Sequence, residues 1–144
     1  MIIPQCKTAT LKSGLVKDDI KKLLNIAKQA AEKGGASLMS NYGRIKTIKC
    51  KGTAGDLVTN ADIECEKIII DYLEKETPNI SILAEESGHK LKDGELKWCI
   101  DPLDGTTNYA HGYPFFATSI GLIWNSNPIL GAISIPSLNE IYYA

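Results

Sequence analysis

WCIDPLDGTTNYAHGYPFFATSIGLIW, residues 98–124, holds two apolar runs joined by a polar segment that carries two acids. The first run ends at Asp101, and the second, 115–124, is rich in the β-branched and aromatic residues that favour strands. Pro102 lacks a backbone donor, so we expect the first strand to stop there and Asp104 to lie in a turn. The stretch therefore predicts two strands with two carboxyl groups at the edge between them.

Two amphipathic helices are predicted before this stretch. Apolar residues recur at a period of 3.6 over 16–41, and Gly43 follows as a candidate C-cap. A second stripe predicts a helix over 60–76, with Thr59 as its N-cap and Asp62 in the capping-box position. Both helices have one apolar face, so each must pack against another element.

Short apolar runs separated by turn residues account for the rest of the chain. We expect further strands at 44–50, 80–84, 129–135 and 140–144. The segments 51–56 and 86–97 are polar and are expected to be loops. This order of elements predicts an α+β fold, with two helices packed on one face of a largely antiparallel sheet.

Composition and charge exclude several classes of protein. The chain has 144 residues, of which 44% are hydrophobic and 23% charged, as expected for one globular domain. A net charge of −1 gives no electrostatic reason to bind nucleic acid or an anionic membrane. No apolar run approaches the roughly 20 residues of a membrane span, and the first residues do not resemble a signal peptide. The four cysteines show no CxxC pairing, so we expect reduced thiols and a cytoplasmic location.

The two acids of the opening stretch need a positive partner. Asp101 and Asp104 are close enough to repel each other, and no lysine or arginine follows Lys97. Mg²⁺ would offset them, because it binds carboxylate and carbonyl oxygens at about 2.0–2.1 Å and keeps waters or substrate phosphate as further ligands. The carbonyl of Leu103, between the acids, is a natural additional ligand.

Neighbouring residues extend this candidate site. Gly105 allows a tight turn, and the amides of Gly105 and Thr106 can point at an anion. Glu85-Glu86 closes the run 80–84 in the same way that Asp101 closes the first strand of the opening stretch. If these two strands are neighbours in the sheet, both sets of acids leave it at the same edge, and Asp62 at its helix start can point there too.

Each of these residues, taken singly, also has an ordinary structural explanation. Asp-Pro and Asp-Gly are common turn dipeptides, and a glutamate pair after a strand is commonly solvated. Asp62 can be a capping acid alone, and Thr106 and Thr107 can be turn hydroxyls. His89 and His111 have no second histidine or cysteine at metal-ligand spacing, so we expect them to be surface residues.

Three motifs occur together and in order: GDLVTNAD from 55, ILAEESG from 82, and WCIDPLDGTTNYAHGYPFFATSIGL from 98. The set resembles the inositol monophosphatase family of magnesium-dependent, lithium-sensitive sugar-phosphate phosphatases. The similarity starts near Val16, runs to the last residue and corresponds to about the first half of the family's chain. It implies a lead-in over 1–15 and, over 16–144, the N-terminal metal-binding domain of the layered αβαβα fold, with the C-terminal domain absent.

The resemblance implies a role for each matching residue. The metal ligands would be Glu85, Asp101, the Leu103 carbonyl and Asp104. The substrate phosphate would be bound by Leu103, Asp104, Gly105 and Thr106. The catalytic residues would be Glu85 and Thr106, which activate the attacking water, and Asp62, which supports Thr106, with Thr107 behind them. A complete site of this kind would hold two or three Mg²⁺ ions.

The resemblance also implies an activity, which is Mg²⁺-dependent hydrolysis of an inositol phosphate or related sugar phosphate by a metal-activated water. A homodimer is one assembly that the resemblance allows. The family's C-terminal WDxAAG-like motif is not in this chain, so we expect a truncated protein with little activity alone. The alternative is a non-catalytic module that binds metal and phosphate and pairs with a full-length relative.

Overall fold

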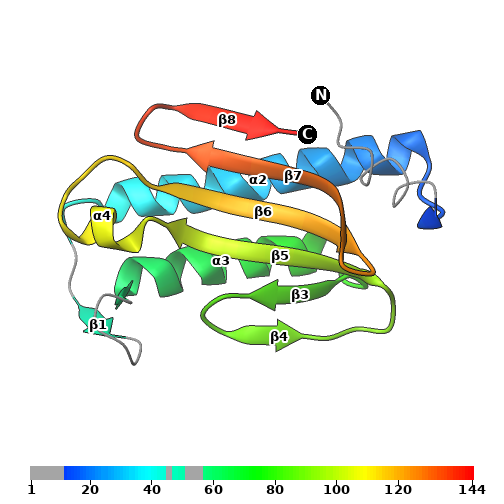
Figure 1. The fold of residues 1–144 in the computed structure, drawn as a ribbon, viewed down its shortest axis with the longest axis horizontal. Coiled ribbons are helices and arrows are strands. Elements are labelled where there is room, and N and C mark those ends of the chain that lie inside the picture. The colour runs from blue at the N-terminus through cyan, green and yellow to red at the C-terminus, as the bar shows by residue number, and fades with distance from the viewer. Residues whose placement is uncertain (1–11, 45–46, 51–56) are drawn as a thin grey trace.

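Two long helices and a six-stranded sheet form the two layers of the molecule (Figure 1). The structure is a computed structural model, and it describes residues 12–44, 47–50 and 57–144. Helix α2, Lys17–Asn41, and helix α3, Asn60–Glu76, contact each other and lie against the same face of the sheet. The predicted α+β fold is therefore confirmed.

Local sequence signals set the ends of both helices. Thr59 caps α3 with its hydroxyl oxygen, and Asp62 in turn accepts the Thr59 N–H, which completes the predicted capping box. Gly43, just after α2, has a left-handed backbone with φ +72°, as expected for the residue that ends a helix. No helix within the described ranges is both long enough and apolar enough to cross a membrane.

The strands of the main sheet run in the order β4-β3-β5-β6-β7-β8. Their bounds are Ser81–Ala84 for β3, Gly88–Lys90 for β4, Leu96–Asp104 for β5, Ala117–Trp124 for β6, Asn127–Ile135 for β7 and Glu140–Tyr143 for β8. In this sheet β3 and β5 pair in parallel, and the other neighbours pair antiparallel. Because β3 and β5 are parallel, the residues that follow them leave the sheet at one edge.

The predicted end of the central strand at Asp101 is wrong. Strand β5 continues through Pro102 to Asp104, and its register with β6 shifts between Asp101 and Asp104. That shift is a β-bulge, where the missing N–H of a proline costs no ladder hydrogen bond. The Pro102 carbonyl turns into the core, where it accepts the hydroxyl of Thr118 at 3.0 Å and the thiol of Cys65 at 3.2 Å.

Three further elements differ from the prediction. Strand β4 lies inside the expected polar loop 86–97, and the short helix α4, Thr106–Ala110, replaces the expected turn after the acids. The expected strand 44–50 is present as β1, Ile48–Cys50, and it pairs with an unpredicted strand β2, Leu57–Thr59. Residues 45 and 46 and the predicted loop 51–56 lie outside the described residues.

The two glycines inside α2 allow it to approach its neighbours closely. A Cβ atom on Gly34 would lie 2.8 Å from the Ile69 side chain of α3 and 2.9 Å from the Thr118 side chain of β6. A Cβ atom on Gly35 would lie 2.8 Å from the hydroxyl oxygen of Ser134. Both contacts are too short for a real side chain, so the cost of glycine within a helix is offset by close packing.

Candidate functional site

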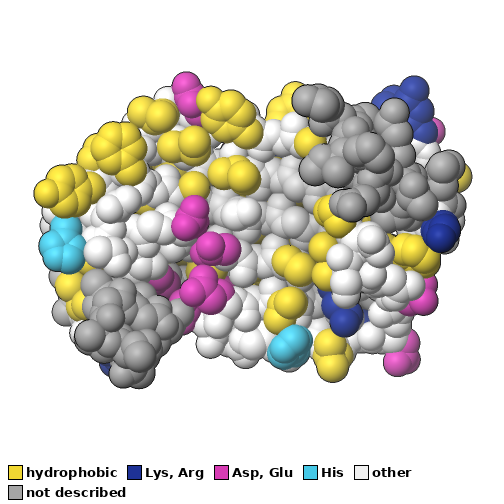
Figure 2. Space-filling model, viewed as in Figure 1, with side chains coloured by type: hydrophobic (Ala, Val, Ile, Leu, Met, Phe, Trp, Pro, Cys, Tyr) yellow, Lys and Arg dark blue, Asp and Glu magenta, His cyan; other side chains and the backbone are white. Residues whose placement is uncertain are grey.

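Three acids lie together at the edge where β3 and β5 end. Glu85 directly follows β3, while Asp101 and Asp104 stand on the last part of β5. Asp101 is half-buried, and the other two are exposed. Figure 2 shows acidic side chains gathered on the face of the sheet that the helices leave open. The predicted meeting of the two sets of acids is therefore what the topology produces.

Burial and the neighbouring acids both raise the pKa of Asp101. The pKa of this carboxyl rises from its ordinary 3.8 to about 7, first because burial disfavours its charge and then because Glu85 and Asp104 are negative. The Leu103 N–H, 3.2 Å from Asp101 Oδ1, acts in the opposite direction. The contact between the side chains of Asp101 and Glu85 raises this pKa further.

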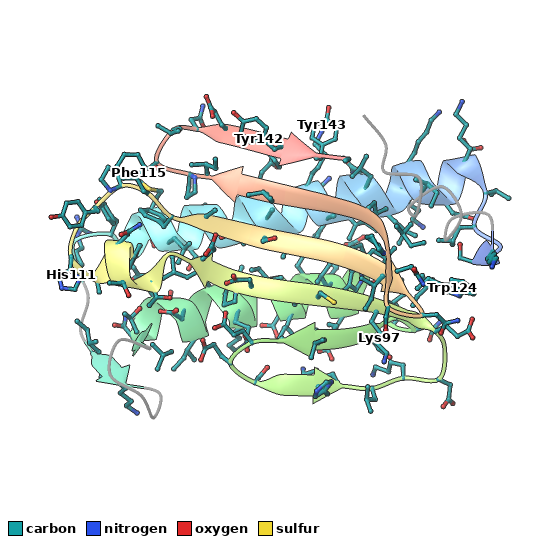
Figure 3. All side chains as sticks on the ribbon, in the orientation of Figure 1. Lys97, His111, Phe115, Trp124, Tyr142 and Tyr143 are labelled. Atoms are coloured by element: carbon teal, nitrogen blue, oxygen red, sulfur yellow. The ribbon has the colours of Figure 1, made fainter. Side chains whose placement is uncertain are left out.

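The donor set suits a hard divalent cation. It combines carboxylate oxygens with the carbonyl of Leu103, and Lys97, the last basic residue of the sequence, stands toward the opposite end of β5 (Figure 3). As the side chains of the described residues stand, no three acids, histidines or cysteines lie close enough together to hold a metal ion. The acids would therefore have to turn toward one another, and Asp101 would have to give up any proton it holds, when a cation binds.

A second group of residues links α3 to the segment after β5. Asp62, 2% exposed, accepts the N–H and the hydroxyl of Thr59 on its Oδ2 at 2.8 Å and 2.6 Å. Its Oδ1 lies 3.1 Å from the hydroxyl of Thr106, which is also 3.0 Å from the Leu103 carbonyl. A hydroxyl has one proton, so Thr106 donates to one of these oxygens and can accept from a further donor.

Gly105 forms the turn that aims α4 at the acids. Its φ of +87° is left-handed, and a Cβ atom there would lie 2.8 Å from the Phe115 carbonyl oxygen. Only glycine satisfies both limits without strain. The N–H groups of the first turn of α4, which begins at Thr106, point out of the end that faces the acids. The Thr107 side chain is exposed on the outer surface of this turn.

The two histidines are surface residues outside the group of edge acids. His89 is exposed on β4, and His111 is exposed at the end of α4, as Figure 3 shows. Nδ1 of His111 lies 2.8 Å from the carbonyl oxygen of Thr107. Both are surface residues, as the sequence predicts.

A groove of about 340 Å³ on the open face of the sheet adjoins the acids. It is lined by Leu83, Ala84, Glu85, Cys99, Ile100, Asp101, Ser119 and Gly121. Two of the three edge acids, Glu85 and Asp101, are part of this lining, so a polar ligand in the groove can reach them.

Sequence reasoning missed one buried acid, Glu66 on α3, which is 3% exposed. Its carboxylate accepts the backbone N–H groups of Glu86 and Ser87 at 2.7 Å and 2.8 Å. The available signal was its position four residues after Asp62, on the stripe of the helix that otherwise carries apolar residues. A charged residue on that stripe indicates an internal partner.

Comparison with known proteins places these features in a family. An inositol-1-monophosphatase from Synechocystis sp. is 43% identical over 127 residues, which make up 88% of this chain and 44% of that protein. A fructose-1,6-bisphosphatase/inositol-1-monophosphatase from Aquifex aeolicus is 39% identical over 128 residues, or 88% of this chain and 48% of that protein. The chain thus spans about half the length of the relatives it matches.

The fold is shared as well. The crystal structure of extragenic suppressor protein suhB from Bartonella henselae matches with a TM-score of 0.81 and 41% identity, covering 85% of this chain and 48% of that one. The model of the inositol monophosphatase family matches residues 19–144, which include every element of the candidate site. On these grounds the chain belongs to the inositol monophosphatase family.

Proposed function

We propose that this chain supplies the metal- and phosphate-binding part of a Mg²⁺-dependent phosphatase that hydrolyses a phosphate monoester of inositol or a related sugar. The observation that carries the proposal is the meeting of Glu85, Asp101 and Asp104 at one sheet edge, beside the hydrogen-bonded pair of Asp62 and Thr106. The names of the relatives from Synechocystis and Aquifex support the substrate class. Because the chain spans about half their length, the activity of a complete protein is part of the proposal.

The metal ligands in this proposal are Glu85, Asp101, the Leu103 carbonyl and Asp104. Bound Mg²⁺ ions, two or three in a complete site, would lower the pKa of a water and offset negative charge on the phosphate. The raised pKa of Asp101 supports this assignment, because after burial its main causes are the negative charges of Glu85 and Asp104, which a cation would offset.

Thr106 and Glu85 are the residues proposed to handle the attacking water. When Thr106 donates its proton to Asp62 Oδ1, its oxygen lone pairs are free to accept a hydrogen bond from that water. The Thr59 N–H and hydroxyl hold Asp62 in place, so its Oδ1 is positioned to accept the Thr106 hydroxyl before substrate arrives. Glu85 is exposed and adjacent to Asp101, in reach of a proton that leaves the water.

The backbone after β5 is proposed to bind the substrate phosphate. The left-handed turn at Gly105 places the start of α4 directly after Asp104, where its first amides and the Thr106 side chain would bind the phosphate. Leu103 and Asp104 would contact the same phosphate, and Thr107 would support the turn from outside. The proposed ligand is a small phosphorylated polyol or sugar. The proposed location is the cytoplasm, where the free thiols of Cys65 and Cys99 would stay reduced.

The test is release of phosphate from inositol 1-phosphate, measured with and without Mg²⁺. Asp104→Asn removes one ligand, and Asp93→Asn, at an exposed acid of the β4–β5 loop, removes the same charge away from the site. We expect Asp104→Asn to lower turnover by about 100-fold or more, since even residues that only orient a metal ligand are worth roughly 10–100-fold. Asp93→Asn should match the unmodified chain.

If the unmodified chain releases phosphate, equal turnover in Asp104→Asn would exclude the metal assignment. A chain that binds Mg²⁺ and phosphate by calorimetry but releases no phosphate from the ester would instead favour the alternative function, a binding or regulatory module. Sedimentation of the same sample would then show whether a second chain, a homodimer partner or a longer relative, joins it.

A further inference from the structure

Glu66, the buried acid of α3, has no role in the chemistry proposed above. It is 3% exposed and lies one helical turn after Asp62 on the side of α3 that faces the sheet. Oε2 accepts the Glu86 N–H at 2.7 Å, and Oε1 accepts the Ser87 N–H at 2.8 Å. Each oxygen thus holds one amide of the turn that follows β3.

This turn contains the candidate ligand Glu85. On one side of Glu85, Ala84 is fixed by its pairing with Ile100 of β5. On the other side the chain enters β4, an edge strand of three residues in which His89 and Lys90 are exposed. A strand this short holds a turn weakly, so the two hydrogen bonds to Glu66 are a main source of order just after Glu85.

Two acids of helix α3, four residues apart, therefore contact the two segments that carry the candidate site. Asp62 holds Thr106, which follows β5, and Glu66 holds the Glu86–Ser87 turn, which follows β3. One face of the same helix therefore contacts both segments, in addition to the direct pairing of β3 with β5.

We propose that Glu66 is a positioning residue, whose carboxylate holds the amides of Glu86 and Ser87 and thereby aims Glu85 at Asp101. This inference rests on the proposed function, because it is there that Glu85 is a metal ligand. Residues that orient metal ligands typically contribute about 10–100-fold to metal affinity. Glu66 acts through the backbone and touches neither metal nor substrate.

The informative variant is Glu66→Gln, which keeps the size of the side chain. A glutamine offers one acceptor oxygen and one NH₂ group, so one of the two turn amides would face a donor. The matched control is Glu64→Gln on the same helix, where the glutamate is exposed and accepts a hydrogen bond from the Asn41 side chain at 3.3 Å. Both variants remove one negative charge from α3.

The experiment measures Mn²⁺ affinity by electron paramagnetic resonance for the unmodified chain, Glu66→Gln, Glu64→Gln, Glu85→Gln and the double variant Glu66→Gln/Glu85→Gln. We expect Glu66→Gln to weaken Mn²⁺ binding by roughly 10-fold or more, and Glu64→Gln to change it by less than about 2-fold. Because Glu66 acts through Glu85, the double variant should bind Mn²⁺ no more weakly than Glu85→Gln alone. A general loss of packing would instead add to the effect of Glu85→Gln.

Amide hydrogen exchange of the unmodified chain tests the contact directly, even if Glu66→Gln does not fold. The Glu86 and Ser87 amides should exchange slowly although their turn lies next to an edge strand. Fast exchange of both amides, equal effects of Glu66→Gln and Glu64→Gln, or an additive double variant would each overturn the positioning role. Failure of the proposed function has a different result: Glu85→Gln would leave Mn²⁺ binding unchanged, which overturns the ligand assignment and the positioning role together.

Discussion

The two buried acids of α3 are surrounded by hydrogen-bond donors, whereas the acids of the sheet edge are surrounded mainly by one another. Asp62 and Glu66 are almost fully buried, yet each accepts hydrogen bonds from fixed donors on both of its oxygens. Asp101 at the sheet edge has a pKa that rises to about 7, first because partial burial disfavours its charge and then because its neighbours Glu85 and Asp104 are negative. What separates the two groups of acids is the kind of group that faces each carboxylate: hydrogen-bond donors for Asp62 and Glu66, and mainly further acids for Asp101.

This difference distinguishes the acids that stabilise the fold from the acids that can bind a cation. A buried carboxylate with all its acceptors in use stabilises the fold and has nothing left to offer a ligand. Acids whose mutual repulsion helps to raise the pKa of one member gain from any cation that offsets their charge. Variants of these acids and of their neighbours should therefore differ in the free energy of unfolding, with the largest loss at the acid that has the most internal partners.

Asp62→Asn should cause the largest loss of stability. The amide retains one acceptor but places an NH₂ group against the donors of either Thr59 or Thr106. Hydrogen bonds to a charged group are worth about 1.5–3 kcal/mol, so we expect the free energy of unfolding to fall by roughly 2–3 kcal/mol. Urea unfolding of Asp62→Asn beside Asp104→Asn measures it, and Asp104→Asn should be no less stable than the unmodified chain in the absence of metal. A larger loss in Asp104→Asn than in Asp62→Asn would reverse the contrast.

Helix α3 and the position of Asp62 could be predicted from the sequence, because the signals for them are local. The Thr59 cap, the Asp62 capping-box acid and the stripe over 60–76 all lie within one element, and the structure has the predicted helix with its predicted bounds. Strand β4 was not predictable in this way, since Gly88–Lys90 is polar and becomes a strand only by pairing with β3. Glu66 was missed for a related reason: its partners belong to a turn 20 residues away.

The sheet edge depended on long-range pairing. That Glu85 and Asp101 meet follows from the parallel register of β3 and β5, for which the sequence offered only a conditional prediction. The rule that proline ends a strand failed at Pro102, because a bulge lets the strand continue without the missing donor. Local patterns thus predicted where the acids lie along the chain, and tertiary contacts decided how they are held together.

Thr118→Val removes a buried hydrogen bond that stabilises the bulge. The Thr118 hydroxyl donates to the Pro102 carbonyl, which the Cys65 thiol also contacts, and this fixes the backbone between Asp101 and Asp104. Because the weaker thiol donor remains, we expect a loss of about 1 kcal/mol in the free energy of unfolding. Ser119→Ala, on the neighbouring half-buried position of the same strand, is the control and should cost less than about 0.5 kcal/mol. Equal losses in the two variants would show that the carbonyl needs no hydroxyl partner.

The smallest effect, and the one with a distinctive pH dependence, is expected for Asp101→Asn in the metal-free chain. The folded-state pKa of Asp101, about 7, lies above its ordinary value of 3.8, so between these values the folded chain holds more protons than the unfolded chain. The free energy of unfolding of the unmodified chain must therefore fall, through this group, as pH rises from about 4 to 7. Asparagine carries no charge, so the variant should not lose this part of its stability.

The measured quantity is the difference in the free energy of unfolding between Asp101→Asn and the unmodified chain, with EDTA present, from pH 4 to 8. It should be near zero at the acid end, favour the variant as the pH approaches 7 and level off above it, staying below about 1 kcal/mol because solvent screens a half-exposed group. Mg²⁺ at pH 8 should reverse the order, since it stabilises only the chain that has the ligand. A difference that does not change with pH would mean that neither burial nor the neighbouring acids raise the pKa of Asp101, and the contrast with Asp62 and Glu66 would then fail.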